Sequence, residues 1–130
     1  MIILKPVDIE EEVRLALADY FEAYTRPLPE KYGLPNVLVQ NAGGSSKNTV
    51  DTFTVSLSVR AETDASAYDL LSSALGVLEE QANRQVGALR NVMINSLARW
   101  GSDPARPDLK LCTATVLVVA HREAAEIQES

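Results

Sequence analysis

The chain has 130 residues, the size of one ordinary domain, and its 46% hydrophobic and 23% charged content is typical of a globular protein. Its formal net charge of −6 argues against a nucleic-acid binder, which normally presents a basic face. One cysteine, Cys112, excludes an internal disulfide, and one histidine, His121, excludes a histidine pair for a metal. We therefore expect a single domain over residues 1–130 with no cofactor and no metal.

The hydrophobic pattern also bears on where the chain resides. No apolar stretch approaches the roughly 20 residues of a membrane helix. The first residues, MIILKPVDIEEE, have too short an apolar run for a secretory signal. We expect a soluble protein made for the cytoplasm, with Cys112 acting as a small buried hydrophobe.

Residues 8–25 predict the first helix, because apolar side chains recur there at helical spacing. Asp8 is suited to cap its N-terminus, with Glu11 completing a capping box, and Pro27 follows its end. The predicted buried stripe consists of Ile9, Val13, Ala16, Leu17, Tyr20, Phe21 and Tyr24.

A hairpin is predicted next. Residues 36–41 indicate a short strand, residues 42–49 a turn segment, and residues 51–61 a strand of strict alternation. In the last of these, one face is apolar and the other carries threonine, serine and arginine, which is typical of a sheet with one buried and one wet face.

The second half predicts a helix over 63–83 with an alanine- and leucine-rich stripe. Residues 87–100 fit a helix or a strand, and we favour the strand because β-branched residues lie at its centre. A loop over 101–108 and a strand over 109–123 follow. The last residues, 124–130, are predicted to form a short helix or to fray.

These elements predict an α+β fold of order α-β-β-α-β-β. We expect a two-layer sandwich, in which two helices cover one face of a four-stranded, mostly antiparallel sheet.

The segment Gly43-Gly44-Ser45-Ser46-Lys47 raises the question of a phosphate-binding loop. Such a loop needs spaced glycines, a Ser or Thr after the lysine and a helix that starts there. Here the glycines are adjacent, Asn48 follows the lysine, and a strand comes next. We interpret residues 42–49 instead as a mobile hairpin loop of the kind that reaches out to a partner.

The sequence offers little for catalysis. His121 could serve as a base, but a surface histidine at a strand end is the ordinary interpretation, and we predict that the protein is not an enzyme. Trp100, beside Arg99, is expected at a loop edge, where it either packs within the domain or contacts a partner.

Charge is unevenly distributed along the chain. Residues 8–30 carry seven acids and two bases, a net of −5, whereas residues 84–106 carry four arginines and one acid, a net of +3. This pattern is either ordinary surface charge or the mark of a subunit that joins head to tail with its copies.

Taken along nearly its whole length, the chain resembles the tail terminator, or tail-completion, proteins of long-tailed bacteriophages. The resemblance rests on the acidic opening helix VDIEEEVRLALADYF, the block LPNVLVQNAGG followed by TFTVSLSVRAET, the helix start DASAYDLL, and the closing DPARPDLKLCTATVLVVAHR. It implies a minor tail protein without catalytic, cofactor or metal-binding residues. Such proteins form a ring, typically a hexamer, that caps the tail tube and presents a surface to the head.

Under this resemblance the expected partners are copies of the chain itself, the tail tube protein and the head–tail connector. No membrane or sequence-specific nucleic acid is expected, although DNA passes through such a ring. The protein would assemble in the host cytoplasm and reside at the head-proximal end of the virion tail. Expected interface residues are Asn41, Gly43, Gly44, Ser45, Ser46, Lys47, Asn48, Arg99 and Trp100. A connector or stopper protein, another minor tail protein and a ferredoxin-like module for a small ligand are the alternatives.

Overall fold

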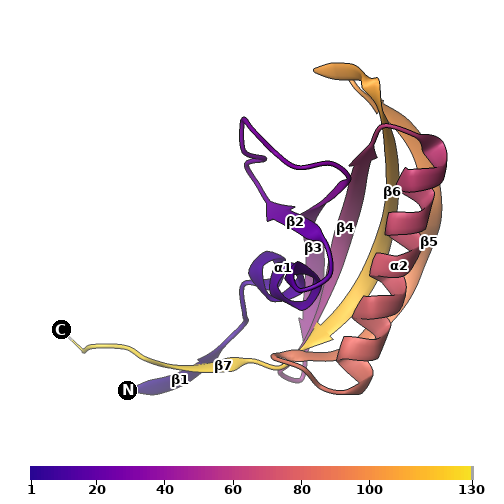
Figure 1. Ribbon diagram of the computed structural model, residues 1–130. Coiled ribbons are helices and arrows are strands. Elements are labelled where there is room, and N and C mark those ends of the chain that lie inside the picture. Colours follow the sequence, from indigo (N-terminus) through magenta and orange to yellow (C-terminus); the bar gives the residue numbers. More distant parts are fainter. Residues whose placement is uncertain (130) are drawn as a thin grey trace.

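A computed structural model describes residues 1–129 of the chain. Two helices and seven strands follow one another along it (Figure 1). In chain order they are β1 (Ile2–Lys5), α1 (Ile9–Ala18), β2 (Glu22–Thr25), β3 (Asn36–Lys47), β4 (Val50–Ala61), α2 (Asp64–Asn83), β5 (Leu89–Asp103), β6 (Arg106–Ala120) and β7 (Glu123–Glu126).

The main sheet has five strands in the order β2-β3-β4-β6-β5, and β1 pairs with β7 in a separate two-stranded sheet. The predicted four-stranded sheet is therefore wrong. The prediction missed the three strands of four residues each, β1, β2 and β7, because strands this short carry almost no periodicity of their own. All pairs are antiparallel except β2 with β3.

The first helix is shorter than predicted. Asp8 caps it as expected, since its Oδ1 accepts the N–H of Glu11 at 3.4 Å, but the helix ends at Ala18. Residues 22–25 pair in parallel with the start of β3, so Tyr24 belongs to a strand and Tyr20 and Phe21 to the turn before it. The backbone of β2 finds its hydrogen bonds on a strand more than ten residues away, which overrides the local helical spacing.

The second helix and the strand after it confirm the sequence predictions. Thr63 caps α2 by accepting the N–H of Ser66 at 3.1 Å on its Oγ1, and the predicted alanine and leucine stripe is buried. Residues 89–103 form a strand, the alternative that we favoured. The predicted loop over 101–108 is wrong, because β5 and β6 pair until Asp103 faces Arg106 and leave only a tight turn between them.

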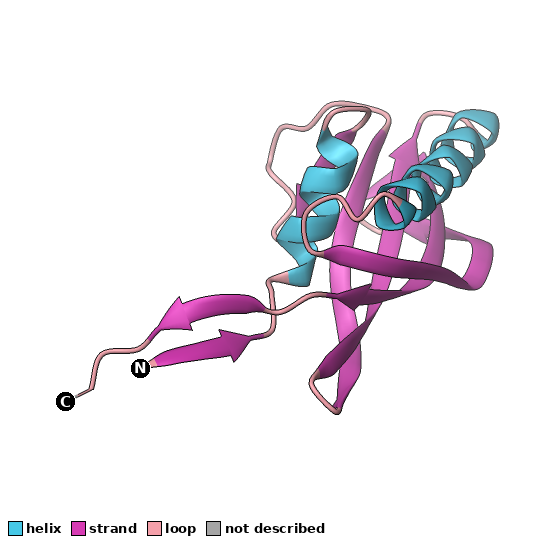
Figure 2. Ribbon diagram, turned by 90° about the horizontal axis from the view of Figure 1, so that it is seen from below, coloured by secondary structure: helices cyan, strands magenta, loops and turns pink. Residues whose placement is uncertain are grey.

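One hydrophobic core joins both helices to one face of the five-stranded sheet (Figures 1 and 2). Side chains of α1, such as Val13 and Leu17, meet Leu71 and Leu78 of α2 over alternate residues of the central strands. Cys112 lies fully buried in this core as predicted, and burial raises the pKa of its thiol.

On the other face of the sheet β4 presents polar side chains, as its alternation predicted, while the neighbouring strands add apolar ones there, Leu38, Leu111, Leu117 and Val119. Hydroxyl groups pair across strands there: Ser58 Oγ lies 3.1 Å from Thr113 Oγ1. Arg60 reaches over β6 to Asp103, with Nε 3.0 Å from Oδ2. This ion pair joins the two halves of the sheet on the face that the helices do not cover.

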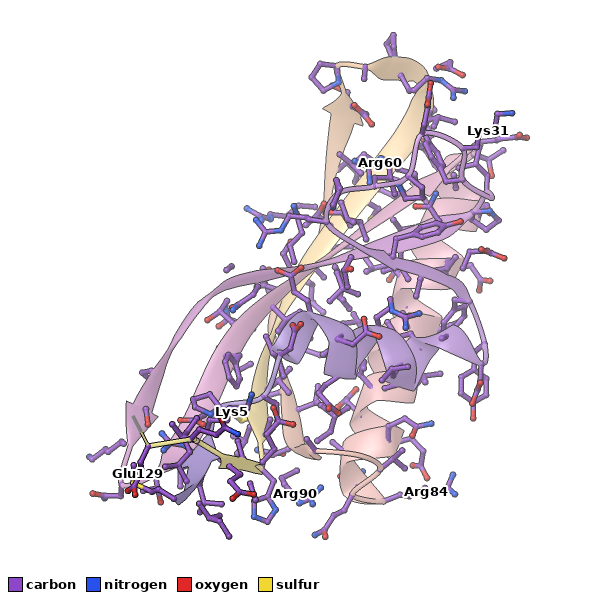
Figure 3. All side chains as sticks on the ribbon, turned by 90° about the vertical axis from the view of Figure 1, so that its left-hand side faces the viewer. Lys5, Lys31, Arg60, Arg84, Arg90 and Glu129 are labelled. Atoms are coloured by element: carbon purple, nitrogen blue, oxygen red, sulfur yellow. The ribbon has the colours of Figure 1, made fainter. Side chains whose placement is uncertain are left out.

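The two ends of the chain form a ribbon that stands apart from the main sheet (Figure 2). We call β1 with β7 the terminal ribbon. The prediction that residues 124–130 form a helix or fray is wrong for residues 124–126, which lie in β7; Ser130 lies outside the described residues. With all side chains drawn, Lys5 and Glu129 lie at the ribbon end of the molecule and Lys31 and Arg60 at the opposite end (Figure 3).

Candidate interaction surfaces

The glycine- and serine-rich segment is a strand rather than a loop, so the prediction of a mobile hairpin loop is wrong. Residues 44–47 pair with residues 50–53 across an antiparallel ladder, and only Asn48 and Thr49 turn the chain. Gly44 is required by this pairing, since a Cβ there would lie 2.4 Å from the carbonyl oxygen of Thr52. Every side chain from residue 41 to residue 50 remains exposed. The segment is therefore an ordered, exposed β-hairpin arm.

An ion pair anchors this hairpin. The guanidinium of Arg122 donates two hydrogen bonds of 2.8 Å to the two carboxylate oxygens of Asp51 and a third of 2.9 Å to Ser46 Oγ. The Asp51 side chain is only 5% exposed. The Arg122 hydrogen bonds, together with that of Ser46, outweigh burial and hold the pKa of Asp51 below its ordinary value. This pair fixes the hairpin to the segment that leads into the terminal ribbon.

A second anchor lies on the other side of the hairpin. Glu10 Oε2 accepts the backbone N–H of Asn41 at 2.9 Å and a hydrogen bond from Arg26 at 2.6 Å. Burial raises the pKa of Glu10, but these hydrogen bonds from Arg26 and Asn41 outweigh it and the pKa is lowered. Helix α1 thus holds the base of the hairpin through a charged carboxylate.

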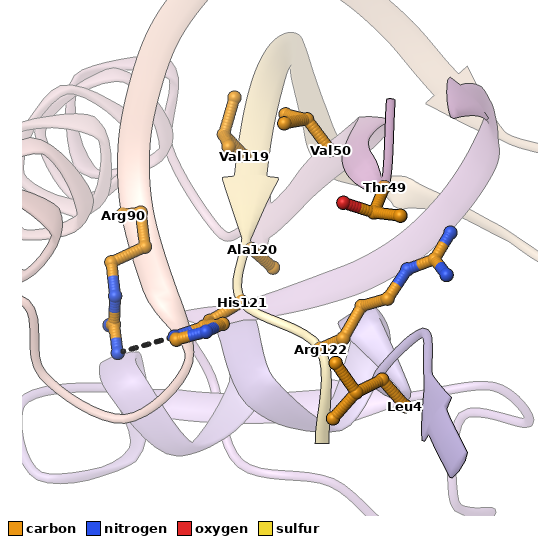
Figure 4. A pocket seen from close by; sticks show the side chains of 8 residues that line it. All are labelled: Leu4, Thr49, Val50, Arg90, Val119, Ala120, His121 and Arg122. Carbon is orange, nitrogen blue, oxygen red and sulfur yellow. Dashed lines mark hydrogen bonds between the residues drawn. The ribbon is translucent and has the colours of Figure 1, made fainter. Parts of the chain in front are cut away.

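An open cavity of about 380 Å³ lies between the hairpin tip, the ends of β5 and β6, and the terminal ribbon (Figure 4). Leu4, Val50 and Val119 contribute apolar surface, and Arg90, His121 and Arg122 contribute nitrogen atoms. Those nitrogens are largely engaged. Arg90 Nη1 donates to the carbonyl oxygens of Gln85, Gly87 and Leu89, its Nη2 lies 3.4 Å from His121 Nδ1, and Arg122 pairs with Asp51. Asp51 therefore neutralises Arg122, whereas Arg90 keeps a positive charge that no acidic side chain among residues 1–129 pairs with.

Arg99 and Trp100 lie in β5 rather than at a loop edge, and Trp100 is 52% exposed. Two register shifts, between Ile94 and Ser96 and between Ser96 and Arg99, add residues to β5 relative to β6. Because of them Ile94 and Trp100 both face the α2 side of the sheet, opposite the buried Val116 and Cys112.

Leu97 lies on the same side, where it and Tyr68 of α2 line an open cavity of about 210 Å³. We call Tyr68, Ile94, Leu97 and Trp100 the outer patch. All four side chains are exposed, Leu97 at 71%. The sequence pointed to Trp100 alone, because the bulges that gather the other three cannot be read from local alternation.

The predicted interface residues do not form one surface. The register places Gly44 level with Val118 and Val92, and Trp100 level with Cys112 and Val59. Residues 41–48 therefore lie near one end of the strands, and Arg99 and Trp100 toward the other. Whether either set contacts a partner stays a prediction.

The terminal ribbon is a further exposed surface, and it was not predicted from the sequence. Ile2 and Leu4 share one face of the ribbon with Ala124 and Glu126, their cross-strand partners. Ile2 is 75% exposed and Leu4 63% exposed. The apolar run Ile2-Ile3-Leu4 could have indicated a strand, but the sequence does not show that this strand pairs with the other end of the chain.

The described residues 1–129 form neither a cluster of metal ligands nor a membrane-spanning helix. Across residues 1–129, His, Cys, Asp and Glu side chains nowhere gather in threes as metal ligands would. Neither described helix is long and apolar enough to cross a membrane. The chain matches no model of a known protein family, and no curated protein is significantly similar to it.

Proposed function

We propose that the chain is a structural subunit that joins copies of itself head to tail into a ring. As its resemblance to phage tail terminators implies, the ring caps a tail tube, ends its growth and offers a surface to the head connector. The proposed role involves no catalysis and no cofactor. It places the protein in the virion tail after assembly in the host cytoplasm.

One observation carries the proposal: two exposed apolar surfaces lie on opposite sides of the subunit. The terminal ribbon projects on one side, and the outer patch lies along β5 and α2 on the other (Figure 1). Contiguous exposed apolar surface usually marks an interaction site. Two unlike surfaces on opposite sides support a heterologous contact, which closes into a ring when the rotation between copies allows it.

The β3–β4 hairpin suits contact with the tube. It is exposed from Asn41 to Val50, yet held at both sides by Asp51–Arg122 and by Glu10. An ordered arm loses less conformational freedom on docking than a mobile loop does. We therefore assign residues 41–48 to the tube or connector, and Arg99 and Trp100 to the contact between copies.

The same surfaces would suit a connector, a stopper or another ring-forming minor tail protein. A ferredoxin-like module for a small ligand is less well supported, because at the larger cavity Arg122 is paired with Asp51 and Arg90 Nη1 already donates to backbone carbonyls.

Negative-stain electron microscopy of the purified protein, alone and mixed with tail tubes, tests the proposal. Rings, or caps at one end of the tubes, are the expected result. Rings that bind portal complexes and ignore tubes would favour the connector alternative. A protein that stays monomeric and leaves tube ends bare would contradict the proposed function.

A further inference from the structure

We infer that the open cavity between the hairpin tip, the ends of β5 and β6, and the terminal ribbon binds a short aliphatic carboxylate. In the bound state the carboxylate lies at Arg90 and His121, and the aliphatic chain lies along Leu4, Val50 and Val119. The inference goes beyond the proposed function, which needs no small ligand, and it applies to the single chain whether or not copies form a ring.

The cavity has the size and the lining of a site for a small ligand. Its volume of about 380 Å³ lies near the lower end of the range of about 300–1,000 Å³ that small-molecule sites span. Such sites combine mostly apolar walls with a few polar groups that orient the ligand. Here the strands β1, β4 and β6 each contribute one apolar side chain, and Arg90 lies next to His121 (Figure 4).

The cavity carries one positive charge that the chain does not neutralise. No acidic side chain among residues 1–129 pairs with Arg90, whereas Asp51 neutralises Arg122. On the side of the ribbon, Lys5 and Glu123 pair with each other. A single net positive charge suits a carboxylate, which carries one negative charge, better than a phosphate monoester, which carries about 1.5 to 2 near neutral pH.

The guanidinium of Arg90 is held in place while one of its edges keeps free donors. Nη1 donates to the carbonyl oxygens of Gln85, Gly87 and Leu89, which fixes the orientation of the group. Nη2 lies 3.4 Å from His121 Nδ1, a contact that uses one of the two Nη2 hydrogens. Arg90 therefore keeps donors on Nη2 and Nε, the edge of a guanidinium that can bind a carboxylate through both oxygens.

His121 supplies a further donor. Because a guanidinium can only donate, His121 Nδ1 accepts in its contact with Arg90, which leaves the proton of the neutral ring on Nε2. The backbone N–H of His121 donates to the carbonyl oxygen of Ala88 at 2.7 Å and holds the residue next to the start of β5. Glu12 accepts the N–H of Ala88 and lines a separate cavity, so its carboxylate does not occupy the donors of Arg90.

A ligand in this cavity would join the terminal ribbon to the main sheet. Leu4 belongs to β1 of the ribbon, whereas Val50 and Val119 belong to the main sheet, so an aliphatic chain between them contacts both. Leu4 is 63% exposed and Val50 is 50% exposed. Covering these side chains removes apolar area from water, which favours binding.

Titration of the full chain with sodium hexanoate, followed in amide NMR spectra, tests the inference. Hexanoate should bind at one site per chain with millimolar or tighter affinity and shift the amide signals of lining residues such as Val50, Val119 and His121. Hexanamide has the same chain without the charge, and acetate has the charge without the chain. Each should bind at least about tenfold more weakly, because it makes only one of the two kinds of contact.

Two variants locate the site. Arg90→Gln removes the charge and should weaken hexanoate binding about tenfold. Since Arg90 also holds backbone carbonyls, Val50→Asp provides a second test: it places a negative charge on the apolar wall and should weaken binding as much. Val50 is half exposed and faces Lys47 across the turn, so this variant should stay folded. Arg84→Gln, at an exposed arginine that caps the end of α2 outside the cavity, is the control and should bind hexanoate as the wild type does.

Several results would overturn the inference. Hexanamide that binds as tightly as hexanoate would show that Arg90 contributes nothing. Amide shifts confined to another surface, such as the cavity at Tyr68 and Leu97, would place the ligand elsewhere. Unchanged affinity in Arg90→Gln and Val50→Asp, or no saturable binding to the wild type below about 10 mM, would contradict it as well. Ring formation is tested separately by electron microscopy, and none of these results bears on it.

Discussion

Asp51 and Arg122 are the most tightly coupled charged pair of the hairpin, and their contact should be visible in the pH dependence of stability. The pKa of Asp51 is lowered in the folded protein, chiefly by Arg122, against about 4 in an unfolded chain. The pair therefore contributes its full stability above about pH 4, and that contribution is lost as the pH falls through the folded pKa.

Asp51→Asn should lower the free energy of unfolding at pH 7, and its difference from the wild type should shrink as the pH falls below about 4. Urea unfolding over a pH series measures this. Asp108→Asn is the control, because Asp108 is also paired with an arginine but is 63% exposed, and its effect should be small at every pH. An Asp51→Asn effect that is unchanged at low pH would contradict the role of the ion pair.

Gly44 illustrates a residue whose importance depends on a neighbouring strand. Gly44→Ala should destabilise the protein by about 1–3 kcal/mol, because the new Cβ would overlap the backbone of Thr52 and force the hairpin strands apart. Gly76→Ala is the matched comparison, since a Cβ there meets nothing within 4 Å and removes a glycine from the interior of α2. It should stabilise by up to about 1 kcal/mol. Equal effects of the two substitutions in thermal unfolding would contradict the hairpin pairing.

Among the elements, the β3–β4 hairpin departs most from its sequence pattern. Its two-residue turn places Asn48 at φ 52° and Thr49 at φ 63°. This is the left-handed region that two-residue hairpin turns require. Asparagine adopts this region readily, whereas a β-branched residue such as threonine adopts it only at an energetic cost.

Thr49→Gly should therefore raise the free energy of unfolding by about 0.5–1 kcal/mol. Asn48→Gly should gain less. Differential scanning calorimetry of the two variants distinguishes them. A larger gain from Asn48→Gly than from Thr49→Gly would mean that the turn does not have the described conformation.

The elements predicted correctly are those whose stabilising contacts lie within their own segment. Helix α2 has its capping residue Thr63, its backbone hydrogen bonds and its apolar stripe inside about twenty residues. The alternation of β4 likewise marks which face is buried. By contrast, the first helix was predicted to continue through Tyr24. Nothing in residues 19–25 indicates that residues 22–25 pair with β3.

The candidate surfaces were predicted only in part for the same reason. Residues 41–48, Arg99 and Trp100 stood out by composition, and the structure leaves them exposed, but at different ends of the sheet. The outer patch depends on bulges in β5, and the terminal ribbon on a pairing between Ile2 and Glu126. Neither the bulges nor this pairing between the two chain ends can be predicted from the local sequence.

Local sequence thus specifies two amphipathic helices and the alternating central strands, because helix hydrogen bonds and the choice of buried face are settled by neighbouring residues. The number of strands, their order and the surfaces free to bind a partner follow from long-range pairing. Each backbone hydrogen bond of a strand needs a donor or acceptor on a second strand, which can lie far away in the sequence. The pairing is therefore determined by the fold of the whole chain.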